Sequence, residues 1–169
     1  MTLHNDTITG YKVFNPDFTC RGYYFNGVGT THTYAWTPVL CKSGFHFCTT
    51  LEDCFKYYPI TPDMIVCEVT ATGYTDAEED CSKRTCQSLS ITRQMPLDEV
   101  VQRITDSYYA YLWAKDIGNQ DIMIHRITNS QWAYCWARYI GNQDIMIDRI
   151  TDSVYAYCWA RDIGNQDIM

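Results

Sequence analysis

The C-terminal part of the chain carries a helical pattern of apolar positions. Asp106 and Ser107 are good N-cap residues for a helix that starts there. Gly118 stands where such a helix ends, because glycine tolerates the left-handed conformation that follows the last turn. Between these signals the apolar residues follow the i, i+3, i+4, i+7 spacing of one helix face: Ala110, Trp113, Ala114 and Ile117.

A second short helix follows in the same unit, and the whole unit recurs. Asn119 can cap this helix, whose apolar face is Ile122, Met123 and Ile127. Nearly identical units start at Thr105, Thr128 and Thr151, a period of 23 residues. Helices of two to three turns are not stable alone in water, so neighbouring units must bury each other's apolar faces. The period therefore predicts a helical repeat array, or solenoid.

The array begins before the obvious copies. In residues 96–104, Val100 aligns with Met123, which predicts a degenerate second helix that joins the array to the N-terminal part. We place the domain boundary there, with one domain at 1–95 and the array at 96–169. The chain stops at Met169, an apolar position, whereas the last repeat of an array normally has a polar outer face. We therefore expect this end either to pack on another molecule, which would include self-association, or to fray.

Residues 1–95 change to short apolar runs separated by turn residues, a pattern typical of strands. A helix is expected over 49–58, where Thr49 or Thr50 caps an apolar face that Pro59 ends. A polar loop is expected over 75–86. This domain is thus α+β and strand-rich, with a hairpin-rich stretch over 21–34 and strands over 11–14, 44–48, 64–73 and 88–94.

Charge and composition exclude several classes. The chain has 169 residues and a net charge of −7, spread over both halves, and no basic stripe that would indicate sequence-specific DNA binding. No apolar run reaches the length of a membrane span, and the start lacks the pattern of a signal peptide. Nine cysteines without a secretory signal predict reduced thiols. The expected location is the cytoplasm, that of the host cell if the chain is phage-encoded.

The stretch "SGFHFCTTLEDCFKYYPITPDMIVCEVTATG" resembles the central segment of the ADP-ribosyltransferase superfamily, which includes the poly-ADP-ribose polymerases. In that family a Gly-x-Tyr-Phe strand and the following helix form one wall of the NAD cleft, and "GYKVF" takes the place of the first cleft strand. Residues 8–95 as a whole are also similar to an uncharacterised domain of phage and prophage proteins, some of which carry helical repeats. The second resemblance implies no activity.

The resemblance to ADP-ribosyltransferases implies a ligand cleft, but this chain departs from the family at residues that the transfer reaction needs. The first cleft strand lacks the Arg or His that holds NAD, and the late strand ends in Gln94 where an active member carries a Glu. Gln cannot accept a proton or stabilise an oxocarbenium-like centre as a carboxylate does. We therefore expect no catalytic residue and no cofactor, or NAD if the chain is an active transferase. The candidate cleft residues are Tyr11, Lys12, Asn15, His46, Tyr57 and Gln94.

Other constellations favour structural roles. A zinc site usually combines two closely spaced pairs of ligands, and the cysteines here lack that spacing. The ligands considered are Cys41, His46, Cys48 and Cys54, with Cys81 and Cys86 as further candidates. Packed thiols are the preferred interpretation, and no metal is expected. His32 is read as a loop residue and not as a base. The glycines at 22, 27 and 29 do not form a phosphate loop, because no strand–glycine–helix order follows.

The repeats favour a pure scaffold, with a partner-binding surface as the alternative. That surface would carry Tyr111, Lys115, Tyr134, Arg138, Tyr157 and Arg161.

Three functions remain open. The preferred one is a non-catalytic phage or mobile-element protein that binds and inhibits a host protein or ribonucleoprotein, such as an anti-CRISPR inhibitor. The alternatives are an ADP-ribosyltransferase that modifies a host protein with NAD, and a protein that binds a nucleotide signal.

Overall fold

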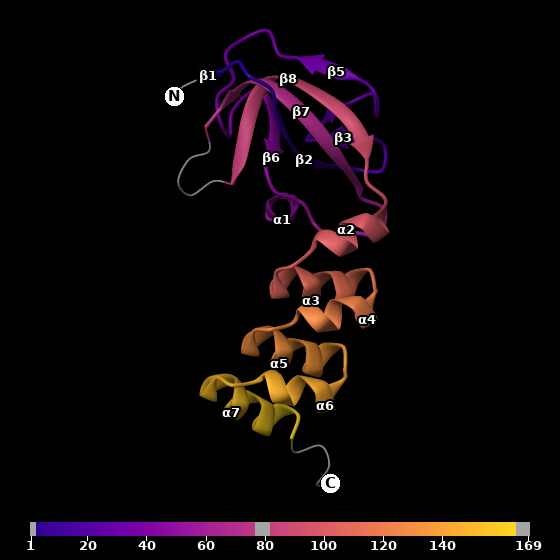
Figure 1. Cartoon of the computed structure of the whole chain (residues 1–169), viewed down its shortest axis with the longest axis vertical. Coiled ribbons are helices and arrows are strands. Elements are labelled where there is room, and N and C mark those ends of the chain that lie inside the picture. Colours follow the sequence, from indigo (N-terminus) through magenta and orange to yellow (C-terminus); the bar gives the residue numbers. More distant parts are fainter. Residues whose placement is uncertain (1–2, 77–81, 165–169) are drawn as a thin grey trace. The chain divides into compact units, whose positions relative to one another are not determined.

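The computed structural model describes residues 3–76 and 82–164, and the chain divides by its contacts into units of residues 1–103 and 104–169 (Figure 1). Each unit is described by itself. The first is strand-rich and the second consists of helices, which gives an α+β protein. This division differs from the expected boundary at residue 95 by the length of one helix, α2 (Leu97–Arg103), which groups with the strands.

The described residues of the first unit form eight strands and two helices. The strands predicted at 11–14, 44–48, 64–73 and 88–94 are all present, and all but the second are longer than expected. The elements before α2 are β1 (Leu3–His4), β2 (Ile8–Phe14), β3 (Thr19–Cys20), β4 (Tyr23–Tyr24), β5 (Thr31–Thr33), β6 (Phe45–Cys48), α1 (Leu51–Cys54), β7 (Ile65–Thr75) and β8 (Lys83–Gln94).

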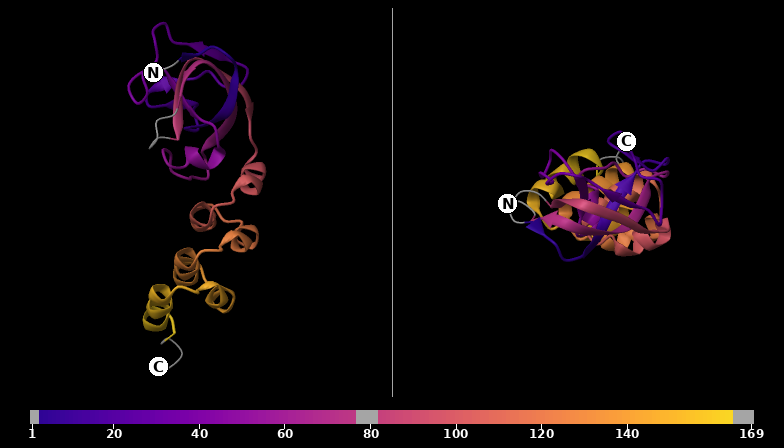
Figure 2. Two further views of the ribbon diagram at one scale, coloured as in Figure 1. Left: turned by 60° about the vertical axis from the view of Figure 1, so that its left-hand side comes forward. Right: turned by 90° about the horizontal axis from the view of Figure 1, so that it is seen from above.

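Four strands pair in a closed circuit. β2 runs antiparallel to β7 from Ile8↔Ala71 to Phe14↔Ile65, and β7 runs antiparallel to β8. β8 then pairs with β6, and β6 returns to β2 through Tyr11↔Cys48. β1 adds to the outside of β7 and β5 to β8, so the order is β1-β7-β2-β6-β8-β5 with β7 and β8 also paired. The sheet is therefore strongly curved, as both views in Figure 2 show.

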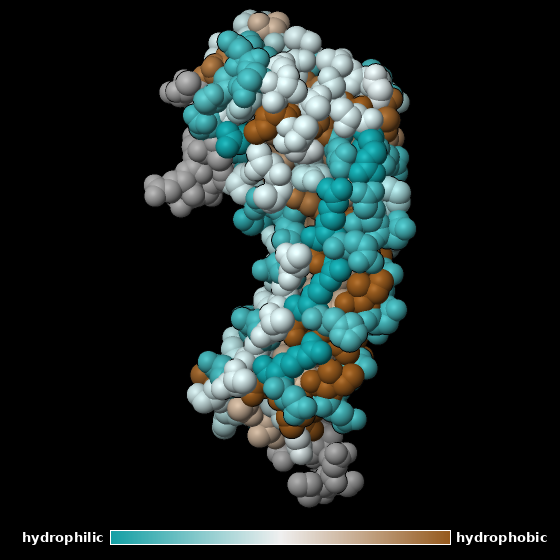
Figure 3. Space-filling view, in the orientation of Figure 1, coloured by the Kyte–Doolittle hydropathy of each residue, from teal (hydrophilic) through white to brown (hydrophobic). Residues whose placement is uncertain are grey.

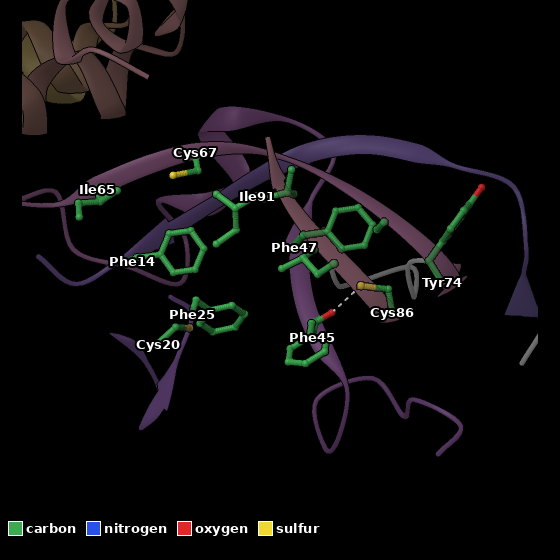
Figure 4. Close-up of a cluster of buried hydrophobic side chains, with 13 residues drawn as sticks. Phe14, Cys20, Phe25, Phe45, Phe47, Ile65, Cys67, Tyr74, Cys86 and Ile91 are labelled. Carbon is green, nitrogen blue, oxygen red and sulfur yellow. Dashed lines mark hydrogen bonds between the residues drawn. The ribbon is translucent and has the colours of Figure 1, made fainter. Parts of the chain in front are cut away.

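The concave side of this sheet holds the core. Cys67, Val69 and Leu89 are fully buried, and Cys86 donates a hydrogen bond from its thiol to the carbonyl of Phe45 (3.3 Å) (Figure 4). The rings of Phe14 and Phe25 meet edge to face with centroids 5.1 Å apart. Burial raises the pKa of the Cys86 thiol to about 12, which keeps it protonated at neutral pH.

Three expectations for this unit need correction. The helix over 49–58 is only the four residues of α1, because the chain from Phe55 continues as turns, in which Tyr57 and Tyr58 are partly buried. His32 lies in β5, buried, where its ring pairs with the hydroxyls of Tyr23 and Thr30 at 3.1 and 3.0 Å. The polar loop over 75–86 is shorter than expected, since β7 reaches Thr75 and β8 starts at Lys83; residues 77–81 lie outside the described part.

A network of four charges joins α2 to the outer face of the sheet. Arg93 donates to Glu68 (2.8 Å) and to Glu99 (2.6 Å), and Arg103 donates to Glu99 (2.8 Å). The pKa of the Glu99 carboxyl is lowered from 4.5 to about 2. The hydrogen-bonded guanidinium of Arg93 makes the larger contribution, and the charge of Arg103 makes a smaller one. Glu68, on β7, is an ion-pair partner of both arginines.

The depressed pKa of Glu99 predicts a pH effect. Because this pKa is lower in the folded chain than in the unfolded chain, the stabilisation is present above pH 4.5 and is lost as the pH falls from there towards 2. Carboxyl chemical shifts of Glu99 in an NMR titration should move with a midpoint near 2. A midpoint close to 4.5 would show that the ion pairs do not persist in solution.

The second unit repeats a long helix and a short one. Its elements are α3 (Ser107–Asp116), α4 (Gln120–Met123), the 3-10 helix η1 (Ile124–Arg126), α5 (Ser130–Tyr139), α6 (Gln143–Met146), the 3-10 helix η2 (Ile147–Arg149) and α7 (Ser153–Asp162). Asp106 caps α3 as expected, because its carboxylate accepts from the N–H of Tyr108 (2.8 Å). Asn119 does not cap α4 through its side chain: it has φ 56°, and its oxygen accepts from the indole of Trp113 (3.3 Å).

Equivalent hydrogen bonds recur between successive helices of this unit. The hydroxyl of Ser107 donates to the carbonyl of Arg126 and accepts from the N–H of Thr128 (2.9 and 3.0 Å). Ser130 bonds in the same way to Arg149 and Thr151 (3.4 and 3.0 Å). Met169, whose apolar position suggested self-association, lies outside the described residues. Within the described residues, no helix has the length and apolar character that crossing a membrane requires.

Candidate ligand pocket

A cavity of about 380 Å³ opens in the first unit. It is enclosed by β2, the β3–β4 hairpin, the segment that leads into β6, β6 itself, the turns after α1 and the start of β8. Its volume lies at the lower end of the range for small-molecule sites, roughly 300–1,000 Å³. The local sequence explains this opening, because β6 is short and pairs with β2 at one register position, so the two strands diverge around the cavity.

Lys12 is the central feature of this pocket. Its side chain is only 3% exposed, and its ammonium group donates a hydrogen bond to the carbonyl of His46 (2.8 Å). The rings of Phe14, Phe25 and Tyr58 surround the ammonium at 5.5, 5.2 and 5.9 Å from their centroids. In the described part of the chain this is the one hydrogen bond of the ammonium group, which forms no ion pair there.

His46 lines the same cavity as a neutral ring. Its Nε2 accepts a hydrogen bond from the backbone N–H of Cys41 (3.0 Å). Burial, followed by the nearby charges of Lys12, Lys83 and Arg21, lowers its pKa from 6.5 to about 4. A neutral imidazole with Nε2 as acceptor carries its proton on Nδ1, so this ring presents a donor at neutral pH.

The described lining is positively charged although the whole chain is acidic. Lys12, Arg21, Lys42 and Lys83 line the cavity, and none of the described lining residues is an Asp or a Glu. Lys83 lies over the ring of Tyr57, with its ammonium 4.6 Å from the centroid. An anion is the ligand that such a lining favours.

Aromatic side chains form most of the remaining wall. The hydroxyl of Tyr57 pairs with Ser82 (3.3 Å), and that of Tyr58 pairs with the thiol of Cys20 (2.9 Å). Burial and the contact with Cys20 raise the pKa of Tyr58 well above its usual value, so the phenol stays protonated. The aromatic lining residues are Tyr11, Tyr23, Phe25, Tyr34, Phe45, Phe47, Tyr57 and Tyr58.

Four of the six cleft residues expected from the sequence line this cavity: Tyr11, Lys12, His46 and Tyr57. Tyr11 is also engaged elsewhere, because its hydroxyl accepts from Arg103 (2.6 Å). Asn15 and Gln94 are exposed and lie outside the lining. The residues that the sequence reasoning missed are Arg21, Lys42, Lys83 and Tyr58. Their basic and aromatic types were visible, but no motif connects segments so distant along the chain.

The cysteines considered as zinc ligands are spread around the pocket and the core. Cys41, Cys48 and Cys54 line the cavity with His46, whereas Cys86 lies in the core. Among residues 3–76 and 82–164, no cluster of three or more His, Cys, Asp or Glu could hold a metal ion; Cys81 falls outside that range. Contact with Cys48 and burial raise the pKa of the Cys54 thiol, which favours the protonated form.

The second unit does not present its tyrosines as one exposed row. Tyr111 and Tyr134 are 7% and 8% exposed, whereas Tyr157 is 66% exposed. Tyr111 stacks on Trp132 with centroids 5.5 Å apart, and Tyr134 bonds to Asp162 (2.5 Å). The basic residues of the expected partner surface are all exposed: Lys115, Arg138 and Arg161.

Comparison with known proteins gives one family. Residues 8–103 match the family model described as "Domain of unknown function (DUF7666)". The match covers β2 to β8, the pocket and α2, and it ends where the contacts divide the chain. Neither the curated proteins nor the solved structures include a significant match.

Proposed function

Because this chain belongs to the DUF7666 family, whose function is unknown, we propose its function from the pocket: it is a binding protein for a small nucleotide. The observation that carries the proposal is Lys12, a buried ammonium with no acidic partner among the described residues. Its neighbours supply flat apolar surfaces for a base, and the other basic lining residues supply charge for a phosphate.

The energetics of Lys12 favour an anionic ligand. The effective cost of burying an ion is several kcal/mol, whereas a cation–π contact contributes about 1 kcal/mol. Three rings near the ammonium and one hydrogen bond to a neutral carbonyl therefore offset only part of this cost. An anion that enters the cavity would form the missing ion pair in a desolvated site, where such pairs are strong.

The size of the cavity favours a mononucleotide over NAD. A volume of about 380 Å³ suits one base, one sugar and a phosphate better than two complete nucleotides. The resemblance to ADP-ribosyltransferases stays a proposal for the fold. In its support, β2, β6 and the turns after α1 all contribute to the pocket, and these are the segments to which the resemblance assigns the NAD cleft. A transfer reaction has less support, because the described lining holds no carboxylate.

Thermal unfolding of the full chain tests this proposal. We expect a 5′-mononucleotide, chosen from the four common ones, to raise the melting temperature. Ligand at 100 times its dissociation constant adds about 2.7 kcal/mol of stability. Lys12→Met should abolish this rise, while Lys56→Met, which removes an exposed charge outside the lining, should keep it. The proposal fails if none of the four mononucleotides shifts the transition at millimolar concentration.

We also propose that the second unit is a solenoid of 23-residue repeats. The recurrent bonds of Ser107 and Ser130, and the burial of Trp113 and Trp136 at equivalent positions, support this arrangement. Such an array buries a continuous core between neighbouring units.

A second candidate function rests on the surface of this unit. Apolar side chains reach its surface, and Figure 3 shows brown patches over its helices. We propose that the surface beyond α3 binds a host protein or ribonucleoprotein, as a phage-encoded inhibitor of anti-CRISPR type would. The large exposed apolar residues beyond α3 are Tyr139, Ile145, Ile147, Val154 and Tyr157.

A plaque assay tests this second function. The chain should protect a phage from a host carrying a CRISPR system, and the double variant Val154→Ser, Tyr157→Ser should not protect. Tyr108→Ser, an exposed position of α3, is the matched control. Equal protection by the double variant would contradict this role for the surface.

A further inference from the structure

We infer that the pocket selects a terminal phosphate monoester, bound as its dianion, over a phosphodiester. This inference rests on the proposed nucleotide-binding function and specifies which nucleotides can occupy the site. It separates 5′-mononucleotides from cyclic mononucleotides and from NAD, whose phosphates carry one negative charge each.

The charges that support the inference come from separate elements and line one cavity. Lys12 lies on β2, Arg21 in the turn between β3 and β4, and Lys83 at the start of β8. All three line this cavity together with His46, and after burial their charges contribute to the lowered pKa of its ring. A monoester phosphate carries about −1.5 to −2 charges at pH 7 and neutralises more of this positive charge than a diester can.

His46 adds a donor that does not depend on protonation. With Nε2 occupied by the N–H of Cys41, the neutral ring carries hydrogen on Nδ1, which has no partner in the described part of the chain. A phosphate monoester has three terminal oxygens that accept hydrogen bonds, and a diester has only two that are not esterified. With Nδ1–H of His46 and the ammonium of Lys12 each on one oxygen, the third oxygen of a monoester remains free to accept from a third donor such as the guanidinium of Arg21, whereas a diester has no such oxygen left.

The pH dependence of binding should come from the ligand. The second pKa of a phosphate monoester is about 6, whereas His46 stays neutral down to about 4. Other titratable groups face the phosphate position from the surrounding elements. They are the lysines and Arg21, the thiols of Cys20, Cys41, Cys48 and Cys54, and the phenols of Tyr57 and Tyr58. His32 lies behind Tyr23, to which it is hydrogen-bonded. Burial lowers the pKa of His32. The pKa values of Cys54 and Tyr58 are raised, so these two groups stay neutral over the same range.

The test is calorimetric titration of the full chain between pH 7.5 and 5 with the four 5′-mononucleotides, the matching 3′,5′-cyclic mononucleotides and NAD. At pH 7.5 we expect the monoester to bind at least about tenfold more tightly than its cyclic counterpart. Between pH 7.5 and 5 the affinity of the monoester should fall about tenfold, because only about a tenth of it is dianionic at pH 5 when its pKa is about 6. Affinity for the cyclic nucleotide should stay constant.

Two variants keep the inference testable if one of them does not fold. Arg21→Met changes an exposed residue and should reduce the preference for the monoester. His46→Gln keeps a neutral donor and should preserve the pH profile.

The possible outcomes are distinct. Equal binding of monoester and cyclic nucleotide, or an affinity that rises on acidification, would overturn the inference and leave nucleotide binding intact. If no nucleotide binds at any pH, the proposed function fails and the inference fails with it.

Discussion

Replacing Lys12 by Met is expected to stabilise the ligand-free chain while it abolishes nucleotide binding. Met has a similar length and no charge, so it can fill the space among Phe14, Phe25 and Tyr58 without the desolvation cost of the ammonium. Replacement of buried charges by apolar residues of similar volume often stabilises proteins by about 1–4 kcal/mol. The gain should appear as a higher urea midpoint for the first unit, measured by circular dichroism.

The stability of the Lys12→Met variant separates two interpretations of the pocket. A gain in stability would mean that the charge is retained for a ligand, at a cost to the free chain. A loss of more than about 1 kcal/mol would contradict this, because it would show that the three rings and the carbonyl of His46 already satisfy the ammonium. Lys56→Met, at an exposed position in the turns after α1, controls for the removal of one positive charge.

Trp113→Ala should be the most destabilising single change in the helical unit. The indole is 0% exposed, and its N–H donates to Asn119 (3.3 Å). Replacing a buried Trp by Ala costs about 3–5 kcal/mol, since it removes apolar contacts and leaves a cavity. Far-ultraviolet circular dichroism during urea unfolding should show the helical signal lost at lower denaturant in this variant.

An exposed aromatic residue of the helical unit supplies a control for Trp113→Ala. Tyr157 is a large aromatic residue of the same unit, yet its side chain is mostly exposed. Tyr157→Ala should change the stability by no more than about 0.5 kcal/mol, as is usual for surface positions. If both variants were equally destabilised, burial between neighbouring helices would not be the source of the stability of this unit.

The long elements could be predicted because their signals are local. The stripe that contains Trp113, the cap at Asp106 and the terminating Gly118 lie within one helix, and each appears in the structure as expected. The helix over 49–58 failed for the opposite reason. Its aromatic residues Phe55 and Tyr58 have helical spacing, but Tyr58 packs, partly buried, against the core formed by distant strands, and the chain after α1 continues as turns.

The pocket was only partly predictable. Lys12 and His46 lie on strands that the sequence pattern identified, and the structure brings them within hydrogen-bonding distance through the carbonyl of His46. Arg21 and Lys83 reach the same cavity from a tight turn and from the start of a strand expected to be loop. Their positions depend on strand pairings far apart in the chain, which no periodicity in the sequence encodes.

The closed circuit of strands also affects how this chain meets other chains. Sheet edges can pair with edges of other molecules and start aggregation, and long flat apolar edges are the most hazardous. In the part of the chain that the structure describes, the outermost strands of the six-stranded sheet are β1 and β5, of two and three residues. The apolar strand β7 pairs along much of its length on both sides. The strand-rich unit can therefore hold a strongly apolar core at high concentration and offer neighbouring molecules very little backbone to pair with.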